Sequence, residues 1–197
     1  MKIIFASQNA GKHRELSAFF APLHLDLVLP AANDTFEVEE TGATFIENAL
    51  IKARHACHIS GLPSLSDDSG LVVKALSGAP GIYSARYAGK KASAAENIKK
   101  LLDNLKNIPD ENRQAYFYCV IVLMQHENDP TPMICEGRWD GFILHEEKGH
   151  LGFGYDPIFY VPSQKKTAAE LPIDLKNKIS HRGIALTLLK RKLLERS

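Results

Sequence analysis

The sequence of 197 residues contains only three cysteines, which lie far apart and include no Cys-x-x-Cys pair. Cys57, Cys119 and Cys135 are an odd number at these spacings, so a disulfide framework is excluded and reduced thiols are expected, as in a cytoplasmic protein. The stretch His55-Ala56-Cys57-His58 has no second group of ligands that would complete a zinc site. We therefore interpret it as part of a helix surface.

Long apolar segments and an excess of charge are also lacking. No apolar run approaches the length of a membrane-spanning helix, and residues 1–5 pass at once into polar residues, so we expect no membrane contact and no secretory signal. Lysine and arginine number 24 against 23 aspartate and glutamate residues. This balance does not supply the basic surface of a nucleic-acid-binding protein, so a nucleic-acid partner is not expected.

The phosphate-binding pattern Gly-x-x-x-x-Gly-Lys-Ser/Thr is absent, but a polar turn follows the first predicted strand, Ile3 to Ala6. A helix is expected from Lys12 to Phe20. Free amides at a helix start, polar side chains and a lysine together favour phosphate binding, although an ordinary polar turn accounts for the same residues. The turn comprises Ser7, Gln8, Asn9, Ala10 and Gly11.

Apolar strands alternate with amphipathic helices along the whole chain, which predicts one α/β domain over residues 1–197. Further strands are expected at 25–29, 116–124 and 133–144, and the strand at 116–124 is apolar enough to be central. Helices are expected after the capping boxes Thr44–Glu47 and Ser93–Glu96, near Asp174, and from Ser180 to Leu194. These elements predict a mixed twisted sheet flanked by helices.

Asp67-Asp68-Ser69-Gly70, just before an apolar run, is the most informative stretch. Two adjacent carboxylates are costly to desolvate unless a cation or proton joins them, and their oxygens suit Mg²⁺. Such a pair is expected to titrate jointly with raised proton affinity. The alternative is an exposed turn. Glu40, before Thr41-Gly42, is a second candidate ligand, whereas Glu37 and Glu39 are interpreted as surface charges.

Two further motifs carry polar groups suited to a nucleotide. Gly152-Phe153-Gly154-Tyr155-Asp156-Pro157 predicts either an exposed ring on which a base stacks or a tight loop with its ring in the core. Asp156 either fixes this loop or meets a ligand. Near the last helix, Lys176 precedes Ser180, a candidate N-cap for His181 and Arg182. Cations are disfavoured at a helix start, so these two residues are interpreted as ligand-binding.

Taken together, the motifs resemble the inosine triphosphate pyrophosphatase family, specifically the bacterial dITP/XTP pyrophosphatases. Each motif is weak alone, but six in the same order are specific. They are Ser-x-Asn-x-Gly-Lys at 7–12, Glu-Glu-Thr-Gly with Phe-Ile-Glu-Asn-Ala at 39–49, Asp-Asp-Ser-Gly at 67–70, Gly-Ala-Pro-Gly-Ile-Tyr-Ser-Ala-Arg-Tyr at 78–87, Phe-Gly-Tyr-Asp-Pro at 153–157 and Ser-His-Arg at 180–182. Ser7 departs from the threonine usual in the family and keeps the hydroxyl.

The resemblance implies an elongated two-lobed fold with its active site in the cleft between the lobes, Mg²⁺ dependence and a homodimer. It implies hydrolysis of (deoxy)inosine and xanthosine triphosphates to monophosphate and pyrophosphate. By position, Asp68 is metal ligand and general base, Glu40 shares the metal, and residues 7–12 hold the triphosphate. The implied substrate contacts are Ser69, Phe153, Gly154, Tyr155, Asp156, Lys176, His181 and Arg182.

Inosine and xanthosine carry a 6-oxo acceptor where adenine carries an amino donor, so donors from His181, Arg182 or nearby backbone distinguish them. A non-catalytic purine nucleotide sensor is the alternative from another class. The paired carboxylates argue against it, because a sensor has little need of a general base.

Overall fold

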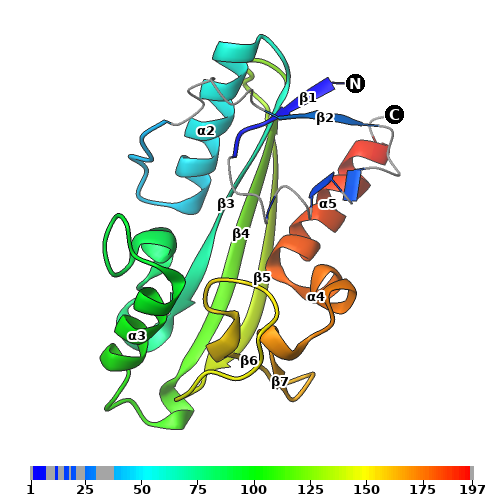
Figure 1. Ribbon diagram of the computed structural model, residues 1–197. Coiled ribbons are helices and arrows are strands. Elements are labelled where there is room, and N and C mark those ends of the chain that lie inside the picture. The colour runs from blue at the N-terminus through cyan, green and yellow to red at the C-terminus, as the bar shows by residue number, and fades with distance from the viewer. Residues whose placement is uncertain are drawn as a thin grey trace. The chain divides into compact units, whose positions relative to one another are not determined.

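The computed structural model describes residues 2–7, 12, 16–17, 19–20, 25–29 and 38–195 (Figure 1). The chain forms two compact units. The first comprises Met1–Asp68, Cys119–Glu136 and Ala185–Ser197, and the second comprises Ser69–Tyr118 and Gly137–Ile184. No helix in these described ranges is long and apolar enough to cross a membrane.

The strands form one seven-stranded sheet in the order β2-β1-β3-β4-β5-β6-β7. β1 pairs in parallel with β2 and β3, whereas β6 pairs antiparallel with β5 and β7, so the sheet is mixed as predicted. β4 is the fourth strand in the order, which confirms its predicted central place. The strands are β1 (Lys2–Phe5), β2 (Asp26–Val28), β3 (Ser64–Val73), β4 (Gln114–Met124), β5 (Met133–Ile143), β6 (Phe159–Val161) and β7 (Lys166–Thr167).

Both predicted capping boxes are present, Thr44 with Glu47 and Ser93 with Glu96. The predicted helix at 12–20 lies partly outside the described residues, and those described within it are helical. The helices are α2 (Phe45–Ser60), α3 (Ala94–Asn104), α4 (Ile173–Ile179) and α5 (His181–Glu195). Short 3-10 helices are η2 (Lys74–Leu76), η3 (Gly81–Arg86), η4 (Asp110–Asn112), η5 (Asp156–Ile158) and η6 (Ala168–Glu170).

Helix α2 is fixed to β3 by serine hydroxyls. Ser66 Oγ donates to the carbonyl of Ala49 at 2.6 Å, and Ser64 Oγ donates to the carbonyl of Ala53 at 2.7 Å. Alternate residues of a strand face the same side, so Asp68 continues the row of Ser64 and Ser66 toward α2. These bonds set the register of α2 on β3 (Figure 1).

The core of the second unit packs α3 against rings from three strands. Phe117 of β4, Trp139 of β5 and Phe159 of β6 belong to one buried cluster with Leu101 and Leu105 of α3. Such a cluster supplies the main favourable free energy of folding for this unit through removal of apolar surface from water.

Arg113 holds the end of α3 to the end of β5 from within this unit. Its side chain is buried and donates to the carbonyl oxygens of Leu105 at 2.8 Å, Ile143 at 2.8 Å and Leu144 at 2.9 Å. The bonds to Leu105 and Ile143 are buried, so those two carbonyl groups would lose their donor without gaining access to water if the guanidinium were removed.

We expect Arg113→Met to lower the free energy of unfolding by about 3 kcal/mol, because it leaves buried carbonyl groups without donors. Arg138→Met is the matched control, since Arg138 is exposed and pairs with Asp140 on the surface. The control is expected to cost less than about 1 kcal/mol. Chemical denaturation measures both, and equal costs would contradict the role given to Arg113.

Candidate functional site

Asp67 and Asp68 lie inside the continuous strand β3 and are both buried. The alternative of an exposed turn is therefore wrong. Neighbouring residues of a strand point to opposite faces, so the two carboxylates are directed apart, although both raise the pKa of Lys52. Asp67 pairs with Lys12, and Asp68 pairs with Lys52. The joint titration expected of the Asp67–Asp68 pair stays a prediction; Asp68 itself is affected chiefly by burial, Lys52 and Glu40.

The contact between Lys12 and Asp67 follows from the parallel pairing of β1 with β3. Phe5 is in register with Leu65, so the chain leaves β1 beside Asp67. The Nζ of Lys12 lies 2.9 Å from Oδ2 of Asp67. Ser7 begins the predicted phosphate-binding turn, whereas Gln8, Asn9, Ala10 and Gly11 lie outside the described residues.

Lys52 of α2 joins the two predicted metal ligands, and sequence analysis did not select it. Its Nζ lies 2.9 Å from Oε1 of Glu40 and 3.0 Å from Oδ1 of Asp68. Its position in the sequence could have indicated this role, because Lys52 lies three residues after Ala49 and one before Ala53, and both alanines are fully buried. A lysine on the buried face of a helix requires a carboxylate partner.

The pKa values in this cluster reflect burial and close charges. Burial raises the pKa of Asp68; Lys52 lowers it and Glu40 raises it, with a net rise above the usual range. Burial lowers the pKa of Lys52, but Asp68, Asp67 and Glu40 outweigh burial and raise it overall. Lys52 therefore stays charged at neutral pH, and Asp68 binds a proton more readily than an ordinary aspartate.

The loop that carries Glu40 is anchored to α2 by Asn48. The backbone N–H of Gly42 donates to Oδ1 of Asn48 at 2.9 Å, and Asn48 is fully buried. A Cβ at position 42 would lie 2.6 Å from Cβ of Glu47 and 2.7 Å from that oxygen. Glycine is thus required for the loop to approach the helix closely enough to place Glu40 beside Lys52.

The donor set around Asp68 fits a hard cation. Oδ2 of Asp68 is buried and has no hydrogen-bond partner among the residues that the structure describes. Over the same ranges, no three His, Cys, Asp or Glu side chains converge as a ready metal cage. One or two carboxylates completed by water and substrate phosphate are typical of Mg²⁺, so Asp68 and Glu40 fit that ion.

In the second unit, Asp156 fixes the Phe153 loop, and the ligand contact expected of Asp156 stays a prediction. Its Oδ2 accepts a hydrogen bond from the N–H of Phe153 at 2.8 Å and pairs with Nζ of buried Lys176. A Cβ at Gly152 would lie 2.1 Å from this oxygen, and Gly152 has a φ of +80°. Only glycine fits this position.

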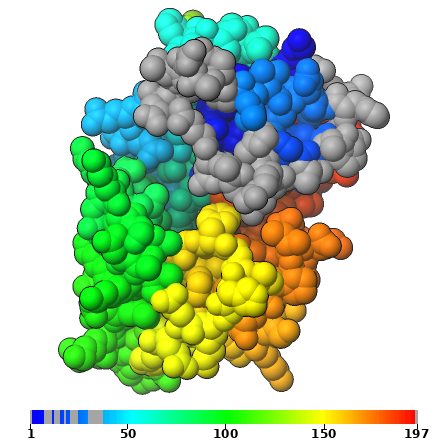
Figure 2. Space-filling view, in the orientation of Figure 1, coloured from blue at the N-terminus to red at the C-terminus, as the bar shows by residue number. Residues whose placement is uncertain are grey.

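Phe153 is 45% exposed, as expected for a stacking surface rather than a core ring. The Nζ of Lys176 lies 4.8 Å from its ring centre and Cζ of Arg182 lies 6.0 Å away. The segment around residue 150, yellow in Figure 2, lies at the surface. Tyr155 instead packs in the core and donates to the carbonyl of Ser84 at 2.8 Å, so only its backbone remains available to a substrate.

The predicted N-cap of α5 is confirmed. α5 begins at His181, and Oγ of Ser180 accepts a hydrogen bond from the N–H of Gly183 at 3.2 Å. Nη2 of Arg182 donates to Oγ of Ser69 at 3.1 Å. The second unit thus brings Ser69, Arg182, Phe153 and Lys176 together. The expected cleft between two lobes stays a prediction.

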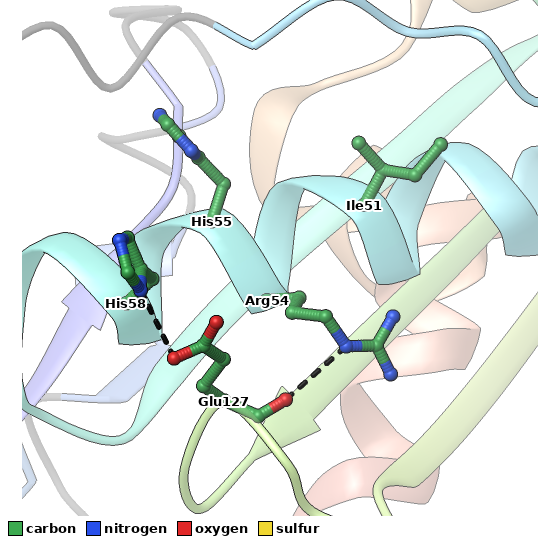
Figure 3. A pocket seen from close by; sticks show the side chains of 5 residues that line it. All are labelled: Ile51, Arg54, His55, His58 and Glu127. Carbon is green, nitrogen blue, oxygen red and sulfur yellow. Dashed lines mark hydrogen bonds and ion pairs between the residues drawn. The ribbon is translucent and has the colours of Figure 1, made fainter.

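Residues 55–58 lie in α2, as predicted, but Ala56 and Cys57 are buried and only the two histidines reach the surface. A hollow of about 300 Å³ is lined by Ile51, Arg54, His55, His58 and Glu127 (Figure 3). Nδ1 of His58 lies 3.0 Å from Oε2 of Glu127, whereas His55 points away from this pair. The thiol of Cys57 faces Ser64 in the interior. These side chains do not converge on one point.

Comparison with known proteins identifies the family to which the chain belongs. The sequence model of the Ham1 family matches residues 3–192. This chain belongs to the Ham1 family. A dITP/XTP pyrophosphatase of Shigella flexneri is 55% identical to it over 188 residues, which is 95% of each chain.

Solved Ham1 structures have the same fold. The HAM1 protein of Coxiella burnetii matches with a TM-score of 0.92 and 52% identity over 99% of both chains. The Ham1 protein of Staphylococcus aureus matches with a TM-score of 0.90 and 41% identity over the full length of both. The α/β architecture expected from the sequence is therefore that of the Ham1 family.

We expect Asp68→Asn to lower kcat on the order of 10³-fold, because it removes the buried carboxylate that Lys52 links to Glu40. Asp140→Asn, an exposed and isosteric change, is the control and should leave kcat unchanged. Steady-state assays with ITP compare the two. A near-normal kcat for Asp68→Asn would show that the assigned role is wrong.

The same variant should not be destabilised at pH 7 in the absence of metal. A raised pKa means that ionised Asp68 is less favourable in the folded than in the unfolded chain, and asparagine removes that cost while Lys52 keeps Glu40. The Tm of the Asp68→Asn variant should therefore exceed that of the unmodified chain at pH 7. This excess should shrink as the pH falls through the raised pKa of Asp68 and vanish below about 4. Thermal denaturation across pH in the presence of a chelator measures it.

Proposed function

We propose that the chain is an Mg²⁺-dependent pyrophosphohydrolase that converts (deoxy)inosine and xanthosine triphosphates to monophosphates and pyrophosphate, removing non-standard purines from the nucleotide pool. The similarity to the dITP/XTP pyrophosphatase of Shigella flexneri supports this reaction. We further propose that it acts in the cytoplasm as a homodimer, as the family resemblance implies.

The main support for this proposal is the hydrogen bonding of the Asp68 carboxylate. One oxygen of this buried carboxylate pairs with Lys52, and the other has no hydrogen-bond partner among the described residues. Asp68 and Glu40 would hold Mg²⁺, which supplies positive charge to the phosphate oxygens and lowers the pKa of bound water. A purely structural carboxylate would be expected to use both oxygens.

Two lysines of the first unit are placed to neutralise the negative charge of a triphosphate. Lys12 and Lys52 each hold a carboxylate partner and bring positive charge to the acidic end of β3. Such charges stabilise a pyrophosphate group as it leaves, because negative charge develops on the bridging oxygen. We place the triphosphate along residues 7–12 and Lys52.

Asp68 is the general base of the proposed reaction. Burial gives it a pKa above that of an ordinary aspartate, which improves its ability to accept a proton at neutral pH. It orients water toward the α-phosphorus and takes the proton as the oxygen–phosphorus bond forms. The bond between the α-phosphorus and the bridging oxygen breaks, and pyrophosphate leaves.

Side chains of the second unit suit the purine. The exposed ring of Phe153 offers a face on which a purine can stack. Asp156 binds the backbone of Phe153, and Lys176 lies over the ring. His181 and Arg182 supply donors for the 6-oxo group of hypoxanthine or xanthine. An adenine amino group would leave those donors unpaired, which disfavours ATP.

Hydrolysis of ITP in ¹⁸O-labelled water with Mg²⁺ tests the cleavage point. The label should enter the nucleoside monophosphate, and pyrophosphate should stay unlabelled. Orthophosphate and a nucleoside diphosphate as first products would overturn the proposed reaction, and nucleotide binding without any product would favour the sensor. ITP, XTP, GTP and ATP are compared with and without Mg²⁺ in the same assay.

His181→Ala and Arg182→Ala should each lower kcat/KM for ITP by roughly 10–1,000-fold, with a smaller effect on residual ATP turnover. The reason is loss of a donor that only the 6-oxo purines use. Steady-state kinetics on both nucleotides give the comparison. Equal losses on ITP and ATP would place these residues on the phosphates instead.

A further inference from the structure

The imidazole of His181 is held against two aromatic rings from neighbouring strands. Its centre lies 4.8 Å from that of Phe117 with an angle of 12° between the ring planes. Trp139 lies 6.4 Å away at 18°. All three side chains are buried. Both separations fall in the range of favourable offset stacking, so the two rings define the plane of the imidazole.

The backbone of His181 is fixed as well. Ser180 caps the first turn of α5, as described above, and Gly183 packs closely on the end of α4. A Cβ at position 183 would lie 2.0 Å from the carbonyl oxygen of Asn177. This close contact limits how far the start of α5 can shift against α4, and the stacked rings further restrict the His181 side chain.

Ring nitrogens donate in the plane of the imidazole, and hydrogen bonds weaken steeply when the donor is misaligned. We propose that Phe117 and Trp139 are positioning residues for purine selection, which act by holding the His181 ring in the plane needed to reach a 6-oxo group. This inference rests on the proposed function, in which His181 contacts the base.

Phe159 provides a matched control from the same cluster. It is fully buried and lies 4.6 Å from Phe117 and 5.3 Å from Trp139. Within the described part of the chain, its ring packs on those two rings and not on His181. A change at Phe159 therefore disturbs the same core without removing a ring from the imidazole.

The test compares Phe117→Leu, Trp139→Leu, Trp139→Phe and Phe159→Leu by kcat/KM for ITP and for ATP, well below the lowest Tm. Phe117→Leu and Trp139→Leu should each lower the ITP-to-ATP ratio roughly tenfold, mainly through ITP. Trp139→Phe keeps a ring against His181 and should restore the ratio to within about twofold. Phe159→Leu should lower Tm and leave the ratio within the same limit.

A double-mutant cycle shows whether Trp139 acts through His181. In a His181→Ala background, Trp139→Leu should cause no further fall in the ratio. A further fall, or an equal fall in Phe159→Leu, would overturn the positioning role while leaving the proposed function intact. If His181→Ala itself leaves the ratio unchanged, the base contact assigned to His181 in the proposed function fails instead.

Discussion

Burial of two consecutive carboxylates in one strand is the constraint that organises the first unit. An ionised carboxylate inside a protein needs a cation close by, and β3 directs Asp67 and Asp68 to opposite faces. Each carboxylate therefore has a lysine in contact with it, Lys12 with Asp67 and Lys52 with Asp68. The serine hydroxyls that bind α2 to β3 keep Lys52 in register with Asp68.

Much of the fold could be predicted from local patterns. A capping box supplies hydrogen bonds to the free backbone N–H groups at a helix start. The starts of α2 and α3 could therefore be predicted from Thr44 and Ser93. The apolar run of β4 showed that it is central, because both faces of such a strand are covered. The division of the chain into two units depends on contacts between distant segments, which no local pattern contains.

The candidate site was only partly predictable for the same reason. Motif residues such as Asp68, Phe153 and Arg182 could be selected by type and order. Lys52 resembles an ordinary surface lysine in a helix until its buried neighbours are considered. The sequence also suggested one acidic pair, whereas strand alternation separates Asp67 from Asp68 and couples Asp68 to Glu40 across Lys52.

The lysine partners of the acidic residues affect whether the folded protein depends on a bound metal in the cell. Proteins whose buried ligands are balanced only by metal unfold when the metal is withdrawn. Here the chain carries its own countercharges, so its folding does not depend on the proposed Mg²⁺. Under the proposed Mg²⁺ dependence, fluctuations in the supply of divalent ions would change how many molecules are active, while the number of folded molecules stays constant.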